Sequence, residues 1–134
     1  MVGMHDTVTI WNKAIENGKT VYYRHVVHNC CWRAETIRSV SGSSVSLATV
    51  WRLMVEMQDE YKPYSEWLEL ADKSAFFTFN AGDIVARGEH EDEMTATNAT
   101  VIYAALKPDA FTVKTVVDNT QQWKHGRHIA VEGV

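Results

Sequence analysis

The sequence predicts a small, mainly β domain, built as an antiparallel β-barrel of six or seven strands with one short helix. Two observations favour this class. Short stretches of alternating polar and apolar residues, rich in β-branched and aromatic side chains, recur along the chain. Turn-forming residues separate these stretches, and only residues 65–71 have clear helical spacing. A long loop between the second and third strands completes the predicted architecture.

Length and composition indicate one globular domain. The chain has 134 residues, interpreted as a single domain over residues 1–134, and 46% of them are hydrophobic while 22% are charged. The net charge of −4 provides no overall basic field for nucleic acid. No apolar run approaches the roughly 20 residues that span a bilayer, and residues 1–6 lack the pattern of a signal peptide. We therefore expect a soluble protein without a membrane partner.

The N-terminal third predicts a long hairpin. Residues 6–12 alternate between polar and apolar side chains, which indicates a first strand. The pair Asn17-Gly18 is favoured where both central residues of a tight turn need positive φ. The second strand, residues 20–33, is longer than most strands, and this length predicts a bend or bulge near Asn29.

The composition changes after the second strand. Residues 34–50 contain four serines between positions 41 and 46, one glycine, and little charge beyond Glu35 and Arg38. A polar stretch of this length between two strands is typical of a functional loop or of a loose surface loop. Both interpretations stay open on composition alone. Residues 51–57 then resume the alternation of a strand.

Residues 76–93 are interpreted as a structural hairpin with an acidic tail. Phe77 and Phe79 alternate with polar residues, Gly82 provides a turn, and residues 84–86 restart the sheet. The acidic tail consists of Glu89, His90, Glu91, Asp92 and Glu93. An acidic run of this kind is usually a solvated face, although it could also chelate a divalent cation.

The remaining segments complete the count. Residues 65–71 predict a short helix with Ser65 as its N-cap. Residues 94–106 fit either a helix or a strand, because their threonines weaken the helical prediction. Residues 110–118 form a clear strand, and residues 123–131 give the final one.

Catalytic signatures are absent from the sequence. It contains no glycine-rich phosphate loop, no G-x-S-x-G and no cysteine set with zinc spacing. Cys30 and Cys31 are adjacent and would point to opposite faces of a strand, so we expect two free thiols. We therefore expect no metal, no cofactor and no enzymatic activity. A small metal-binding β-barrel domain or enzyme, using the histidines and the acidic tail, is the alternative of another class.

The order of motifs resembles one family. DTVTIWNK opens the chain, CCWRAE ends the long strand, and WRLMVEM follows the predicted loop. Residues 62–89 read KPYSEWLELADKSAFFTFNAGDIVARGE, and DAFTVKTVVDN and WKHGRHIAVEG close the sequence. This order is similar to that of small head–tail joining proteins, of the head-completion or stopper type, from long-tailed phages and prophages of Gram-positive bacteria. The resemblance covers nearly the whole chain and rests on structural motifs.

The resemblance implies a structural virion protein, made in the host cytoplasm and assembled as a hexameric ring in the neck of the particle. The ring would join the portal or adaptor protein above to the tail or tail-terminator protein below, around double-stranded genomic DNA. In that family a loop after the second strand projects into the channel and helps retain DNA, and residues 34–50 occupy its place. The DNA-proximal candidates are therefore Arg38, Ser39, Ser41, Gly42, Ser43, Ser44 and Ser46.

Aromatic residues provide candidates for interfaces. Five tryptophans, five tyrosines and four phenylalanines are many for one small barrel, so we expect some of them at subunit contacts. A tail terminator and a minor capsid protein are the alternatives within the same virion. The candidates for subunit or partner interfaces are Trp11, Trp51, Tyr64, Trp67, Glu89, Glu91, Asp92, Glu93 and Trp123.

Overall fold

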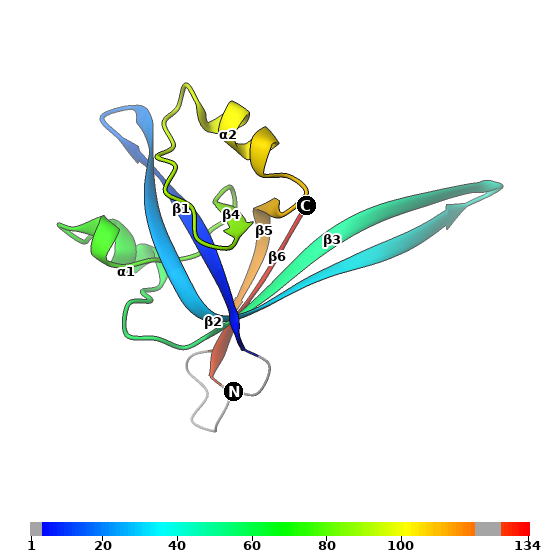
Figure 1. The fold of residues 1–134 in the computed structure, drawn as a ribbon, viewed down its shortest axis with the longest axis horizontal. Coiled ribbons are helices and arrows are strands. Elements are labelled where there is room, and N and C mark those ends of the chain that lie inside the picture. The colour runs from blue at the N-terminus through cyan, green and yellow to red at the C-terminus, as the bar shows by residue number, and fades with distance from the viewer. Residues whose placement is uncertain (1–3, 120–126) are drawn as a thin grey trace.

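The computed structural model describes residues 4–119 and 127–134 (Figure 1). The mainly β fold predicted from the sequence is confirmed, but the prediction of a single helix is too low by one α-helix and one 3-10 helix. The elements, in chain order, are β1 (Asp6–Glu16), β2 (Lys19–Ser41), β3 (Ser44–Glu56), α1 (Tyr64–Leu68), the 3-10 helix η1 (Lys73–Ala75), β4 (Ile84–Arg87), α2 (Ala99–Leu106), β5 (Ala110–Asp118) and β6 (His128–Gly133).

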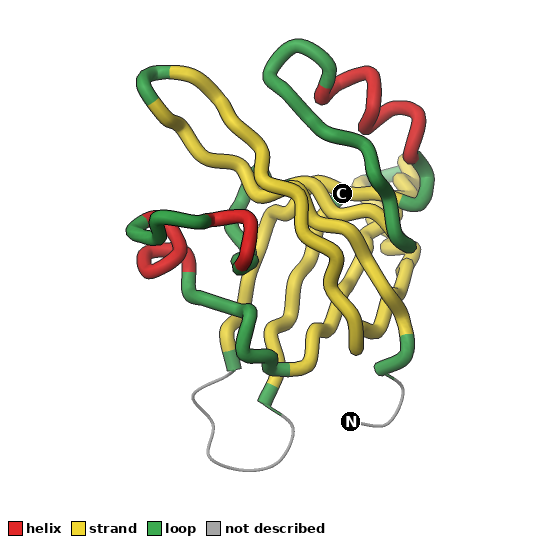
Figure 2. Tube along the Cα trace, turned by 60° about the vertical axis from the view of Figure 1, so that its left-hand side comes forward, coloured by secondary structure: helices red, strands yellow, loops and turns green. Residues whose placement is uncertain are grey.

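The six strands close into an antiparallel barrel in the order β1-β2-β3-β6-β5-β4. The short strand β4 completes the closure, because it pairs with β1 on one side and with β5 on the other. Figure 2 shows the strands wrapping around a common axis, with the helices outside the sheet. Closure removes the free sheet edges that a barrel strand would otherwise expose.

Alternating side chains fill the interior of this barrel. Val8 and Ile10 on β1 are fully buried and point inward, as the alternation of the first strand predicts. Trp11 lies on the opposite side of β1, in a second cluster that α2 covers. The main cluster is made by Val8, Ile10, Val27, Cys30, Leu53, Val55, Tyr61, Phe77, Phe79, Val85, Phe111, Val113, Ile129 and Val131.

Two backbone features of the β1–β2 hairpin confirm the sequence prediction. Asn17 and Gly18 have φ values of 53° and 74°, which are the positive values that a two-residue turn between antiparallel strands requires. Asn29 has φ of 60°, and the register between β1 and β2 shifts between Asp6 and Val8. The predicted bulge is therefore present, and it bends β2 where the strand leaves its pairing with β1.

The segment before β4 differs from the predicted hairpin. Only Ile84–Arg87 is a strand, whereas Phe77 makes one parallel bridge with Tyr61. The reason is that β4 pairs with β1 on one side and with β5 on the other, so the residues around Phe77 have no neighbouring strand with which to form a ladder. The Phe77 and Phe79 rings instead enter the main core, where 0% and 3% of their surface is exposed.

A buried carboxylate holds this segment to β1. Asp83 is 1% exposed and its two oxygens accept three hydrogen bonds, from the Lys13 amide at 2.8 Å, the Asn12 side-chain amide at 2.9 Å and the Asn80 amide at 2.8 Å. Burial raises the pKa of Asp83 to about 6, although the hydrogen bonds act in the opposite direction. These hydrogen bonds therefore connect the predicted turn, at the start of β4, to β1.

Both helices lie on the outside of the barrel. In α1 the N-cap residue is Pro63 and makes no side-chain cap, so the prediction of Ser65 as N-cap is wrong. The ambiguous residues 94–106 contain the helix α2. Ile102, Tyr103 and Leu106 of α2 pack on the cluster around Trp11, and this burial outweighs the low helix propensity of the segment.

Candidate functional site

The predicted loop between the second and third strands is a β-ribbon instead. Strands β2 and β3 pair continuously from Cys30 opposite Val55 to Ser41 opposite Ser44. The prediction failed because the serine-rich composition resembled a loop, while the alternation of small and β-branched residues fits a ladder closed by a two-residue turn. Gly42, the first residue of that turn, has φ of 61°. We call residues 34–50 the arm.

The arm projects far from the rest of the molecule (Figure 1). Strand β1 pairs with β2 only as far as Cys30, and β6 pairs with β3 only from Trp51 onward. The eight residues from Ala34 to the turn extend about 25 Å at the usual rise of a strand. The arm is therefore a two-stranded ribbon with neither of its faces and neither of its outer edges covered by the described part of the chain.

The pairing register divides the side chains of the arm between two faces. Directly opposite residues share a face, so Arg38 and Val40 lie with their partners Leu47 and Val45 on what we call the apolar face. This face exposes 62% of Val40 and 70% of Leu47. The opposite face, the serine face, carries Glu35, Ile37, Ser39, Ser41, Ser44, Ser46, Ala48 and Val50.

The register also fixes which backbone groups are free. Residues flanking a two-residue turn exchange both of their backbone hydrogen bonds, and every second pair along the ladder repeats this pattern. Ser41 and Ser44 flank the turn of the arm. The intervening pairs, which are those of the apolar face, therefore direct their backbone N–H and C=O groups outward. Both outer edges of the arm offer unpaired donors and acceptors at these positions.

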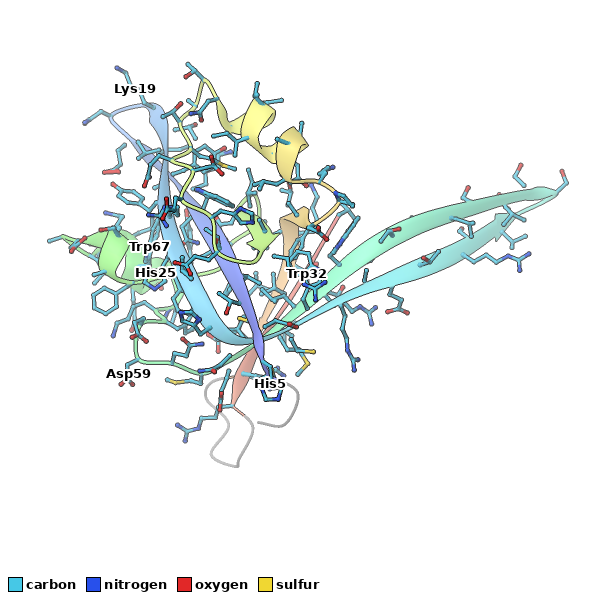
Figure 3. All side chains as sticks on the ribbon, viewed as in Figure 1. His5, Lys19, His25, Trp32, Asp59 and Trp67 are labelled. Carbon is cyan, nitrogen blue, oxygen red and sulfur yellow. The ribbon has the colours of Figure 1, made fainter. Side chains whose placement is uncertain are left out.

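Two tryptophans anchor the root of the arm in the barrel. Trp32 and Trp51 are half-buried and pack against the main core. The Trp32 ring lies 5.3 Å from the Phe111 ring, measured between centroids. Figure 3 shows Trp32 at the point where β2 leaves the barrel. The base of the arm is thus fixed to the core by large side chains, whereas the two strands of its outer part pair only with each other.

Charged residues surround the same root on the serine face. Arg52 pairs with Glu35 at 2.8 Å and with Glu132 at 3.3 Å. Arg33 lies directly opposite Arg52 in the ladder, and within the described residues it forms no ion pair. Arg33, Ala34, Glu35 and Arg52 line a hollow of about 390 Å³. The sequence prediction missed this cluster, because only the cross-strand register brings Arg33, Glu35 and Arg52 together.

All seven predicted DNA-proximal residues lie on the arm and are exposed. Arg38 is on the apolar face, and no carboxylate of the described residues pairs with it. The hydroxyls of Ser39 and Ser46 are on the opposite face, at directly paired positions. The predicted set is therefore one continuous structural unit, but its single cation and its serines face different directions.

Two of the predicted interface aromatics are core residues. Trp11 and Trp67 are both 0% exposed, so neither is available for contact with another subunit. The Trp11 ring nitrogen donates to the Asp92 carbonyl at 2.9 Å, and that of Trp67 donates to the carbonyls of Lys73 and Phe76. Trp11 thereby connects β1 to the acidic tail, and Trp67 connects α1 to the segment that contains η1. The prediction of Trp11 and Trp67 as interface residues is wrong, because both side chains are fully buried.

Tyr64 and Trp51, two other aromatic candidates, remain partly accessible. Tyr64 is half-buried, with its ring 6.3 Å from that of Trp67. Trp51 is half-buried at the arm root. Trp123 lies outside the described residues.

The acidic tail is a surface segment tied to β1 and β2. Glu89, Glu91, Asp92 and Glu93 are all exposed. Arg24 pairs with Glu93 at 3.2 Å and also donates to the His90 carbonyl at 3.1 Å. Across residues 4–119 and 127–134, no three His, Cys, Asp or Glu side chains gather where they could hold a metal ion.

The titratable groups with shifted pKa values belong to the barrel and its surroundings. Burial raises the pKa of the Cys30 thiol to about 12, which keeps it protonated and unreactive. Burial, together with a hydrogen bond to Asp118, also raises the pKa of Tyr61. Both cysteines are free thiols, as predicted from their adjacency. The arm thus has exposed edges and side chains to offer a partner, without an activated nucleophile or base.

The sequence of this chain matches one known family. The profile of one family matches residues 4–134, which is nearly the entire chain. The chain belongs to DUF6751, a family of unknown function. No curated protein and no solved structure matches it. In this DUF6751 member, no helix among the described residues is long and apolar enough to cross a membrane.

Proposed function

We propose that this protein is a structural component of the neck of a long-tailed phage particle. It forms a ring, six-fold in our proposal, between the portal or adaptor protein and the tail, and it helps close the DNA channel. The role requires no enzymatic activity. The observation that carries the proposal is the arm, a long projection from a closed barrel, at the position where the resembling family has its channel loop.

The physical properties of the arm suit a channel that must both pass and retain DNA. Its reach of about 25 Å would carry the turn from a ring of barrels toward a central axis. The serines can donate hydrogen bonds to phosphates without sequence preference. Arg38 is the single cation between Ala34 and Val50, so the electrostatic attraction to DNA would be weak and sensitive to salt. Weak attraction allows the duplex to move during packaging and ejection.

The barrel fits the role of a scaffold for such a projection. A closed sheet can hold a ribbon rigidly at its base, and Trp32 and Trp51 connect the arm root to the core. The exposed carboxylates of residues 89–93 provide a second surface, suited to a basic region of a neighbouring protein. The proposed ring therefore has separate parts for folding, for neighbour contacts and for the channel.

A shortened arm tests the proposal. Replacing residues 38–47 by Asn-Gly would leave Ile37 and Ala48, an already paired position, flanking a new two-residue turn. We expect particles carrying this variant to assemble and fill, and then to lose their genomes, as measured by nuclease-protected DNA. A double variant S41T/S44T is the matched control, since it keeps the length, register and hydroxyls of the arm. Normal retention of DNA by the shortened variant would contradict the proposal.

A further inference from the structure

We infer that the arm is a self-association element, whose free strand edges pair with those of the arm of a second copy of this chain. The inference goes beyond the proposed function, because it concerns the isolated protein and requires no particle. It rests on the edges of the arm, on its charge and on the distribution of its apolar side chains.

The edges of the arm lack the features that keep exposed strands from pairing. Proteins protect such edges with lysines, prolines, bulges or very short strands. The ladder between β2 and β3 runs from Cys30 to the turn without a register shift. Residues 34–50 contain no proline and no lysine, and their only charges are Glu35 and Arg38. A long, regular and nearly uncharged edge is a template for another strand.

A second copy of the arm is the partner that fits these edges. Within the described chain the barrel strands already pair with one another in a closed sheet, so none of them is available to pair with the edges of the arm. An identical arm offers a strand of equal length and spacing. Glu35 is already paired with Arg52, which leaves only Arg38 as an unpaired charge on each arm. Two arms therefore meet without opposing rows of like charge.

The two edges of one arm also complement each other. In arms that point in the same direction, the β2 edge of one copy runs antiparallel to the β3 edge of the next. Repetition of this contact is heterologous, and a rotation that closes would satisfy every edge in a cyclic assembly. A pair of identical edges, by contrast, would leave the other edge of each arm unpaired. The structure thus favours a closed ring of arms over a simple dimer.

The apolar face gives such pairing an additional driving force. Val40, Val45 and Leu47 are 62%, 52% and 70% exposed and lie at neighbouring positions on this face. Their backbone groups are also the ones that point outward from the ladder. Pairing of two arms would therefore bring these side chains next to one another across the new contact and satisfy the backbone groups at the same time.

Analytical ultracentrifugation of the purified full chain tests the inference with a matched pair of variants. L47K places a charge on the apolar face, at a position with outward backbone groups, whereas S46K places the same charge one residue away on the serine face. We expect wild type and S46K to form a discrete oligomer as concentration rises. L47K and the shortened arm should associate at least tenfold more weakly, with unchanged circular dichroism. A wild-type protein that stays monomeric, or a shortened arm that associates equally well, would overturn the inference.

Amide hydrogen exchange locates the contact in the same samples. The amides of Val45, Leu47 and Thr49 point outward in the free arm and should become protected as the oligomer forms. The amides of Ser44 and Ser46 bond within the arm and are the internal reference. Outward amides that exchange equally fast in monomer and oligomer would overturn the inference, because the contact would then lie elsewhere. The position of the chain in a particle does not affect this result, so the two proposals fail independently.

Discussion

Strands β2 and β3 run through both the barrel and the arm, yet their side chains and edges have opposite environments in the two regions. In the barrel each strand has two neighbours and its inward side chains, such as Leu53 and Val55, are 0% exposed. In the arm the strands have only each other, and Leu47 is 70% exposed. The difference shows that burial, and not local strand formation, separates the stable part of the fold from the part available to partners.

The largest contrast lies within β3, at two leucines six residues apart. Leu53→Ala should lower the free energy of unfolding by about 2–5 kcal/mol, because the side chain is fully buried in the main core. Urea denaturation monitored by tryptophan fluorescence would measure this loss. A cost below about 1 kcal/mol would show that the barrel interior is not a tightly packed core.

The buried carboxylate of the barrel gives a prediction for pH. Burial raises the pKa of Asp83 from 3.8 to about 6, so the folded protein holds this proton more tightly than the unfolded chain. The stability from this group is complete below about pH 4 and is lost as the pH rises through about 6. Asp83→Asn removes the titration. Between pH 4 and pH 7, wild type should therefore lose up to about 3 kcal/mol relative to the variant.

Urea titrations of both proteins at several pH values would measure this difference directly. Other carboxylates contribute equally to wild type and variant, so they cancel in the comparison. A difference that stays constant across this range would mean that Asp83 has an ordinary pKa in the folded state.

Two glycines, Gly133 in the barrel and Gly42 in the arm, differ in the space around them. A Cβ on Gly133 would lie 2.1 Å from the Thr112 carbonyl oxygen and 2.3 Å from the Phe111 ring, so Gly133→Ala should cost about 1–3 kcal/mol. Gly42 in the arm turn has no atom within 4 Å of such a Cβ. Gly42→Ala should strain the turn through its positive φ and leave the thermal unfolding of the barrel unchanged. Equal losses of melting temperature would contradict this division.

The smallest expected effect is at the exposed leucine of the arm. Leu47→Ala should change the free energy of unfolding by no more than about 0.5 kcal/mol, because little of the side chain is buried in the folded chain. The measurement is made at low protein concentration, where arms do not associate. A loss comparable to that of Leu53→Ala would mean that the arm packs against the barrel and is not a free projection.

The sequence was sufficient for the features that local patterns determine. The alternation of residues 6–12 and the Asn-Gly pair predicted the first hairpin and its turn, both of which are confirmed. The bulge at Asn29 followed from the length of the second strand. These features depend on neighbouring residues alone, so no knowledge of the tertiary structure was needed.

Features that depend on distant partners were not predictable. Phe77 lies in a strand-like pattern, but no neighbouring strand is available to it. The large number of aromatic residues suggested that Trp11 and Trp67 lie at the surface, but both are buried. Trp11 donates to Asp92, which comes much later in the chain, and Trp67 belongs to helix α1, which packs outside the sheet. The cluster of Arg33, Glu35 and Arg52 needs the register of β2 and β3, which composition does not reveal.

The arm combines both situations. Its position, its exposed serines and Arg38 followed from the sequence, whereas its form as a paired ribbon did not. A serine-rich segment has no strong intrinsic preference for a strand, and the ladder forms because both ends continue barrel strands that are already aligned. The scaffold therefore determines the structure of the segment that projects from it.

The position of this chain in a reconstruction of the intact particle is the most direct test of the proposed neck role. We predict a ring of copies at the vertex that joins head and tail, with the barrels outside and the arms directed toward the channel axis. The same map would show whether neighbouring arms are paired through their edges. A chain located on the outer surface of the capsid, or a neck ring with its arms directed away from the channel, would contradict the account.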